Sequence, residues 1–221
     1  MSIAKNLQKI KETLQEGVEL VAVSKTKPSS DIEEAYAAGQ RVFGENRPQE
    51  MKGKAEELPK DIEWHMIGHL QSKKTKYIAP FVSLIHSVDK LSLLQEINKR
   101  AAQNERVINV LLQVYISKEE SKYGMDESEV VELLSSEEFN ALQNIKVVGL
   151  MGMATNTDNE ATIRNEFKGL KTFFDSLTQN NYSKNVELTI LSTGMSGDYH
   201  IAMEEGSNMV RIGSSIFGSR G

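Results

Sequence analysis

Cysteine is absent from this sequence of 221 residues, and proline occurs only four times. The lack of cysteine excludes disulfides and thiolate metal sites. Residues 1–17, MSIAKNLQKIKETLQEG, contain no apolar core of the length found in signal peptides. No apolar run approaches the roughly 18 residues of a membrane span. We therefore expect a cytoplasmic protein with no membrane attachment.

A surplus of basic residues is also missing, because 31 acidic residues outnumber 26 basic ones and the net charge is −5. This balance gives no indication of nucleic-acid binding. No Ser/Gly-rich, Pro-rich or long charged tract divides the chain, and no repeat is evident. A chain of 221 residues suits one barrel. We therefore expect a single domain over residues 1–221.

The sequence instead shows a regular alternation of apolar, β-branched runs with amphipathic segments. Eight strands that alternate with helices are typical of a (β/α)8 TIM barrel. An extra helix at about residues 3–15 would precede the first strand. The alternative, an open doubly wound sheet, would carry a Gly-rich fingerprint after an early strand, and none is present there. The predicted strands are residues 18–24, 41–45, 64–68, 83–87, 108–115, 146–153, 186–192 and 208–213.

The segments between these runs carry helix signals. SSDIEEAYAAG offers Ser29, Ser30 and Asp31 as capping residues at its start and Gly39 at its end. KLSLLQEINKRAAQN places its apolar residues on one helical face. These segments would cover the outside of the barrel.

The end of the first strand carries the first candidate for chemistry. Active residues of such barrels lie on the loops that follow the carboxyl ends of the strands, and Ser24, Lys25 and Lys27 stand at such a position. A lysine inside a barrel mouth loses solvation, which favours the neutral, nucleophilic amine that a Schiff base needs. The alternative is an ordinary surface lysine. A Ser24–Lys25 dyad is discounted, because adjacent residues of a strand point to opposite faces.

Two turns near the carboxyl terminus are rich in glycine and hydroxyl side chains. Ser192, Thr193 and Gly194 follow the seventh strand, and Gly213, Ser214 and Ser215 follow the eighth. Backbone N–H groups at a helix start bind phosphate, and glycine allows close approach. Either turn alone reads as an ordinary Gly/Ser turn. Together, at the two strands that usually form the phosphate site of a barrel, they predict a phosphate cup.

Arg211 lies within the eighth strand in the apolar context MVRIG. It either points into the barrel or extends its charged group outward to water. Inside the barrel, the guanidinium would donate a hydrogen bond to a ring nitrogen or to an anion.

The histidines and methionines give weaker signals. His65 and His69 are four residues apart, but the HExxH pattern is absent and WHMIG predicts a strand, so we expect no metal site. His86 and His200 have no legible partner in the sequence. The Met-rich segment GLMGM on the sixth strand indicates barrel packing.

Six motifs resemble those of the pyridoxal phosphate homeostasis protein family, in the same order: VSKTKP, VFGEN, WHMIGHLQ, GLMGMA, LSTGMSGD and VRIGSSIFG. The resemblance covers the chain from about Val21 to Gly218. It implies a barrel similar to the N-terminal domain of alanine racemase. It also implies that pyridoxal 5′-phosphate (PLP) is the cofactor and that Lys25 holds it as a Schiff base.

The same resemblance implies roles for other residues. Arg211 would face the pyridine nitrogen of PLP. Ser192, Thr193, Gly213 and Ser214 would hold the phosphate. The residues that would line the pocket around the ring are Asn46, His65, Gly68 and Met195.

The sequence departs from the family pattern at three positions. Arg47 and Pro48 follow FGEN where the family has Tyr and Val, and Lys73 stands where Asn is usual. We expect these residues on the rim, where they would affect partners more than cofactor binding. Lys122 and Gly124 of ISKEESKYG are retained in their usual places.

The family resemblance implies a carrier or regulator of PLP and no catalytic residue. The first alternative is an amino-acid racemase, which needs a base on each face of the cofactor. Lys25 would serve one face, and no tyrosine lies in a matching motif for the other. The second alternative is a Schiff-base aldolase, which would bind a phosphorylated substrate and no chromophore.

We expect a monomer whose further partners are PLP-dependent enzymes that lack their cofactor.

Overall fold

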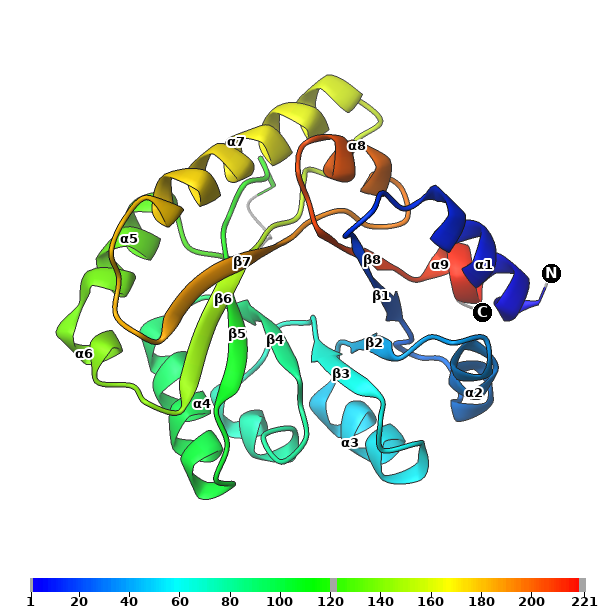
Figure 1. Cartoon of the computed structure of the whole chain (residues 1–221), viewed down its shortest axis with the longest axis horizontal. Coiled ribbons are helices and arrows are strands. Elements are labelled where there is room, and N and C mark those ends of the chain that lie inside the picture. Colours follow the sequence, from blue (N-terminus) through cyan, green and yellow to red (C-terminus); the bar gives the residue numbers. More distant parts are fainter. Residues whose placement is uncertain (1, 120–122, 219–221) are drawn as a thin grey trace.

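The computed structural model describes residues 2–119 and 123–218. Its strands form a closed barrel in the order β1 to β8, and all neighbouring strands are parallel, including β1 and β8 (Figure 1). The strands are β1 (Glu19–Val23), β2 (Val42–Glu45), β3 (Glu63–Met66), β4 (Leu84–Val88), β5 (Ile108–Gln113), β6 (Ile145–Met151), β7 (Val186–Ser192) and β8 (Met209–Ile212). Each overlaps one of the predicted strands, so the predicted (β/α)8 barrel is confirmed.

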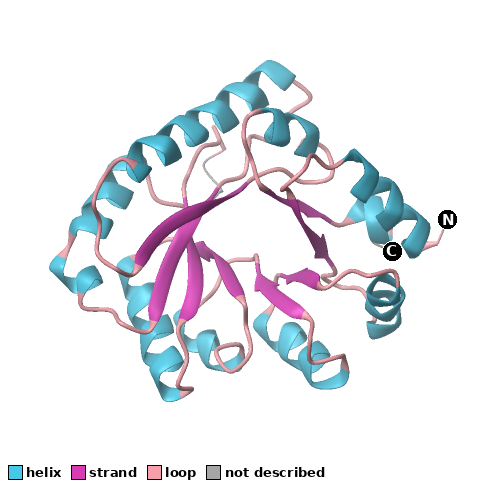
Figure 2. Cartoon of the chain, viewed as in Figure 1, coloured by secondary structure: helices cyan, strands magenta, loops and turns pink. Residues whose placement is uncertain are grey.

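Helices surround the ring of strands on its outside (Figure 2). The α-helices are α1 (Ile3–Thr13), α2 (Ser29–Ala37), α3 (Pro48–Glu57), α4 (Leu91–Gln103), α5 (Glu127–Ser135), α6 (Glu137–Asn140), α7 (Glu160–Thr178), α8 (Tyr199–Glu204) and α9 (Ser214–Phe217). A 3-10 helix, η1 (Ser72–Tyr77), follows β3. The extra N-terminal helix is therefore present, as α1. Lys122 of the ISKEESKYG motif lies outside the described residues.

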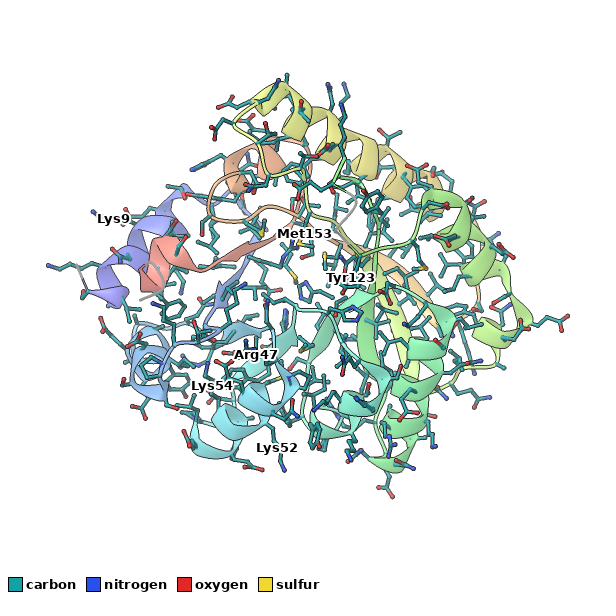
Figure 3. The ribbon with its side chains drawn as sticks, turned by 180° about the vertical axis from the view of Figure 1, so that it is seen from behind. Lys9, Arg47, Lys52, Lys54, Tyr123 and Met153 are labelled. Carbon is teal, nitrogen blue, oxygen red and sulfur yellow. The ribbon has the colours of Figure 1, made fainter. Side chains whose placement is uncertain are left out.

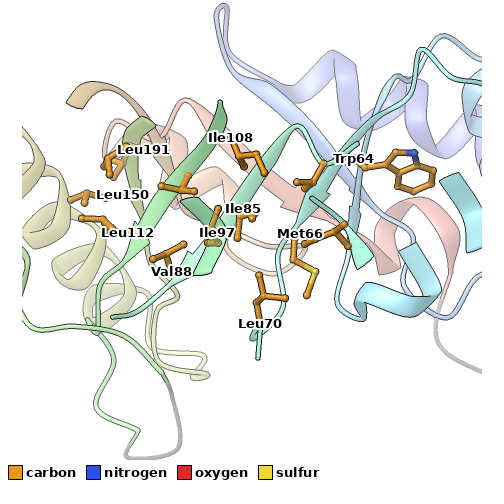
Figure 4. Packing of buried hydrophobic residues seen from close by; sticks show 14 of the residues in the cluster. Trp64, Met66, Leu70, Ile85, Val88, Ile97, Ile108, Leu112, Leu150 and Leu191 are labelled. Carbon is orange, nitrogen blue, oxygen red and sulfur yellow. The ribbon is translucent and has the colours of Figure 1, made fainter. Parts of the chain in front are cut away.

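Most strands are largely apolar because both of their faces are buried, whereas in β7 only Leu191 and Ser192 are buried. On β1, Leu20 and Ala22 pack outward against the helices, whereas Val21 packs inward. Figure 4 shows part of the outer layer, which extends from Trp64 on β3 to Leu191 on β7. The inner cluster consists of Val21, Val42, Leu84, Leu111, Val148, Met151 and Met209. This cluster fills the barrel interior below the carboxyl ends of the strands.

Helix α2 begins differently from the prediction. Its N-cap is Pro28, which makes no side-chain capping bond, and the helix starts at Ser29. The capping role predicted for Ser29, Ser30 and Asp31 is therefore wrong. Gly39 ends the segment as predicted, with φ of +90° and its N–H bonded to Tyr36 O at 2.9 Å. A positive φ of this kind favours glycine because it has no Cβ.

Helix α1 ties the two ends of the chain together. Asn6 Nδ2 donates to Ile216 O of α9 at 3.0 Å, and the two helices lie side by side in Figure 1. In the part of the chain that is described, no helix is both long enough and apolar enough to cross a membrane. The cytoplasmic location stays a prediction.

Candidate functional site

A cavity of about 310 Å³ lies at the carboxyl ends of the strands. Its volume is at the lower end of the range of about 300–1,000 Å³ that is usual for small-molecule sites. Figure 3 shows Met153, which lines this cavity, near the middle of the barrel. The lining includes Lys25 after β1, Asn46 after β2, Ile67 after β3, Met153 after β6, Ser196 after β7 and Gly213 after β8.

Lys25 enters this cavity from the turn that follows β1. Val21 of the strand lies in the inner core, and Val23 and Lys25 line the cavity above it. Ser24 faces the other way, and its Oγ donates to Glu45 Oε1 at 2.6 Å. Ser24 and Lys25 therefore point to opposite faces, as predicted, and cannot act as a dyad.

The cavity has a cationic lining in a protein of net charge −5. Lys25, Lys27 and Arg211 line it, and no acidic side chain is among the described lining residues. Low-dielectric walls that carry one sign of charge focus the field within a cleft. The site is therefore suited to an anionic ligand.

The turns after β7 and β8 meet at one side of the cavity. Ser196 and Gly197 line it from the first turn, and Gly213 and Ser214 from the second. The two turns are joined directly, since Gly213 N donates to Ser196 Oγ at 3.3 Å. Small residues leave backbone N–H groups and hydroxyls accessible, which is the donor set that a phosphate requires. A phosphate-binding turn can therefore be built here.

The predicted phosphate ligands Ser192 and Thr193 lie one layer deeper. Their exposed fractions are 0% and 1%, and neither lines the cavity. Ser192 Oγ is already engaged, at 2.6 Å from Arg211 Nη1 and 3.0 Å from His86 Nδ1. Ser196, which stands four residues further along the same LSTGMSGD motif and does line the cavity, was not predicted.

Arg211 points into the barrel, where its side chain forms the floor of the cavity. Nη1 donates to Ser192 O at 2.8 Å, and Nη2 donates to Gly152 O at 3.1 Å. Burial lowers the pKa of Arg211 to about 10, although Asp198 opposes this shift. The guanidinium therefore stays cationic at neutral pH and can act only as a donor.

The two buried histidines pair with each other. His86 Nε2 lies 3.0 Å from His65 Nδ1, so the expectation that His86 has no partner is wrong. Burial lowers the pKa of His65 to about 3, and burial with His65 and Arg211 nearby lowers that of His86 far below its usual value. Both rings are therefore neutral at pH 7. His65 supports the floor and does not itself line the cavity.

A hydrogen-bonded network connects Arg211, Ser192 and the two histidines. Since the guanidinium only donates, Ser192 Oγ accepts from Arg211, and it also bonds His86 Nδ1. Each neutral imidazole carries one proton, so the contact between His86 Nε2 and His65 Nδ1 pairs one N–H with one acceptor nitrogen. The network thus holds Arg211 in place without adding a second charge to the floor.

Of the other residues predicted for the pocket, two line the cavity and one packs behind a lining residue. Asn46 and Met195 line the cavity, whereas Gly68 packs behind Asn46, where an added Cβ would lie 2.6 Å from Asn46 O. GLMGM contributes more than packing: Met151 belongs to the inner core, but Met153 lines the cavity. In the described part of the chain, no group of three or more histidine or acidic residues is placed to hold a metal ion.

Two of the residues that depart from the family pattern are exposed, as expected for a rim. Arg47 and Lys73 are exposed, whereas Pro48 is buried at the first position of α3. Arg47 lines a second cavity of about 440 Å³ that shares Asn46 with the first. Arg47 therefore borders the cofactor-sized cavity without entering it.

Comparison with known proteins assigns the chain to a family. The family described as "Alanine racemase, N-terminal domain" matches residues 1–221. The pyridoxal phosphate homeostasis protein of Aquifex aeolicus is 41% identical over 100% of this chain and 99% of that protein. That of Schizosaccharomyces pombe is 40% identical over 91% of this chain and 84% of that protein. The chain belongs to the pyridoxal phosphate homeostasis protein family.

Solved structures agree with this assignment. PipY of Synechococcus elongatus, a 37% identical protein, superposes with a TM-score of 0.89 without PLP and 0.87 with PLP bound. Both superpositions cover 98% of this chain and 100% of the PipY chain. Alanine racemase from Bartonella henselae shares the fold at 15% identity, with a TM-score of 0.73, and this chain spans 58% of it. The family barrel is thus the fold that the racemase carries in one part of its chain.

Proposed function

We propose that this protein binds PLP as a Schiff base on Lys25 and acts as a carrier or regulator of PLP. The observation that carries the proposal is the position of Lys25 inside a cationic cavity that small-residue turns border on one side. Membership in the pyridoxal phosphate homeostasis protein family and the PLP-bound structure of PipY support it.

The described residues fit the chemical groups of PLP. Ser196, Gly197, Gly213 and Ser214 would hold the phosphate, in place of Ser192 and Thr193. PLP supplies an aldehyde, which condenses with the Lys25 amine and releases one water, so no oxidant or reductant is required.

Arg211 has the role of holding the ring nitrogen unprotonated. An arginine is cationic and has no acceptor, so it can only donate to that nitrogen. A ring without the extra proton withdraws electrons less strongly than a pyridinium. The floor of the cavity therefore favours storage of PLP over carbanion chemistry.

Titration with PLP tests the function. We expect saturable appearance of Schiff-base absorbance, and borohydride reduction should make the attachment permanent. A protein that binds phosphorylated carbonyl substrates and cleaves them, without any absorbance change on addition of PLP, would contradict the proposal and support the aldolase alternative. Transfer to partner enzymes is tested by mixing the loaded protein with a cofactor-free transaminase and following the recovery of its activity.

We further propose that amino-acid turnover by this protein is marginal. Apart from Lys25 and its near neighbour Lys27, no described lining residue has a side chain that works as a general acid or base near neutral pH. Loss of one acid–base partner typically costs about 10²–10⁴-fold in rate. Chirality and keto-acid formation should therefore stay near background when the loaded protein is incubated with L-alanine and other amino acids. A rate in the ordinary kcat range of about 1–10³ s⁻¹ would support the racemase alternative.

A further inference from the structure

A buried cluster of charges lies behind the first strand, on the side away from the cavity. Lys54 of α3 places Nζ 2.7 Å from Glu45 Oε1 and 2.8 Å from Glu50 Oε1. The exposed fractions of the Lys54 and Glu45 side chains are 8% and 0%. We call Lys54, Glu45 and Glu50 the Lys54 cluster. Charged residues are rarely buried this deeply unless they are paired, so this cluster requires a reason.

The Lys54 cluster holds the backbone on both sides of Lys25. On one side, Lys54 Nζ donates to Ser24 O at 2.9 Å. On the other side, Thr26 N donates to Glu50 Oε1 at 2.7 Å. The same Glu50 oxygen binds Lys54 Nζ, so one ammonium connects both contacts. The two peptide groups that flank Lys25 are therefore fixed relative to each other.

This turn needs support, because its conformation is unfavourable. Thr26 has φ of +64°, a left-handed conformation that β-branched residues rarely adopt. Such conformations persist only where the surrounding structure holds them, and they are common at functional sites. The bond from Thr26 N to Glu50 is one such restraint.

The side chain of Ser24 completes the arrangement. Its Oγ donates to Glu45 Oε1, which holds Ser24 toward α3 and therefore turns Lys25 toward the cavity. Glu45 has no other role at the cavity, since it faces the helices and its Oε2 lacks a hydrogen-bond partner among the described residues. Burial raises the pKa of Glu45, which shows that its environment disfavours an unpaired charge. Lys54 supplies the compensating charge.

We propose that Lys54 is a positioning residue that fixes the turn around Lys25 and so directs the Lys25 amine into the cavity. The inference rests on the proposed attachment of PLP to Lys25. It goes further by assigning the geometry of that attachment to a residue that does not line the cavity.

The variant Lys54→Met tests this role, with Lys52→Met as its matched control. Lys52 lies on the same helix, is 48% exposed and pairs only at 3.5 Å with Glu56 in the described salt bridges. Figure 3 labels both lysines. The two measurements are the rate of Schiff-base formation with PLP and the affinity for pyridoxine 5′-phosphate. This second ligand has the ring and phosphate of PLP but no aldehyde, so it reports binding without formation of a Schiff base.

We expect Lys54→Met to slow Schiff-base formation on the order of tenfold or more, since small misplacements of reacting groups have effects of this size. Its affinity for pyridoxine 5′-phosphate should stay unchanged, and Lys52→Met should match the parent protein in both measurements. Lys54→Arg, which keeps the cationic donor, should restore part of the rate.

Lys54→Met leaves Glu45 buried without its partner and could fail to fold, so Glu50→Ala provides a second test. The Glu50 side chain is 23% exposed, and its removal frees Thr26 N while the Lys54–Glu45 pair stays intact. We expect the same selective slowing. Unchanged rates in the folded variants, or equal losses for PLP and pyridoxine 5′-phosphate, would overturn the positioning role alone. Absence of a Schiff base in the parent protein would overturn both this role and the proposed function.

Discussion

Replacement of Lys25 by alanine is expected to abolish the Schiff-base absorbance while the barrel stays folded. Lys25 lies beyond the end of β1 and belongs to none of the buried apolar clusters, so its replacement removes no packing from them. Only an amine can condense with the aldehyde of PLP, and no alanine side chain can substitute for it. The measurement is the absorbance of the variant after addition of PLP, with thermal unfolding as the check on folding.

Lys27→Ala is the control, because Lys27 lines the same cavity from the same turn. This variant should keep the absorbance. Borohydride reduction of the parent protein followed by peptide mapping should place the pyridoxyl group on Lys25. Recovery of the label only on Lys27 or Lys122, or persistence of the absorbance in Lys25→Ala, would show that the attachment site is wrong.

Removal of the phosphate from the ligand is expected to have the second large effect. Pyridoxal should bind at least about tenfold more weakly than PLP, because each hydrogen bond to a charged group contributes about 1.5–3 kcal/mol. The turns at Ser196 and Gly213 offer several such donors. The measurement is a titration of both ligands at the same pH and ionic strength.

Two serine variants locate this effect within the cavity. Ser196→Ala should reduce the affinity for PLP and narrow the difference between PLP and pyridoxal. Ser215→Ala is the control, since Ser215 is exposed and does not line the cavity. Equal affinities of PLP and pyridoxal for the parent protein would mean that the turns after β7 and β8 are ordinary turns.

The architecture was predictable because its signals are local. Most strands of the barrel are short apolar runs, and their burial on both faces distinguishes them from the amphipathic helices that follow. That Lys25 lies just beyond the carboxyl end of β1 was predictable for the same reason, since the apolar run that forms this strand ends directly before it. Arg211 could be narrowed to two orientations, and the barrel interior proved to be the correct one.

Whether a residue near the end of a strand lies below the cavity or in its lining was not predictable. Ser192 and Ser196 occur in one motif, and both suit a phosphate by composition. The structure places Ser192 at the end of β7, below the cavity floor, and Ser196 in the turn above it. The difference depends on where the strand ends and how far the barrel side chains fill the interior, which are properties of the closed barrel.

Contacts between residues that are far apart in the sequence were likewise decided by the tertiary structure. His65 and His86 stand on the neighbouring strands β3 and β4, and their pairing depends on the register between these two strands. Lys52 and Lys54 are residues of the same type, two positions apart in the sequence. Yet one is solvated and the other is buried against Glu45, because the packing of α3 on the barrel turns only Lys54 inward. The sequence therefore determines the elements and the residue types at their ends, whereas the closure of the barrel and the docking of the helices determine which side chains meet.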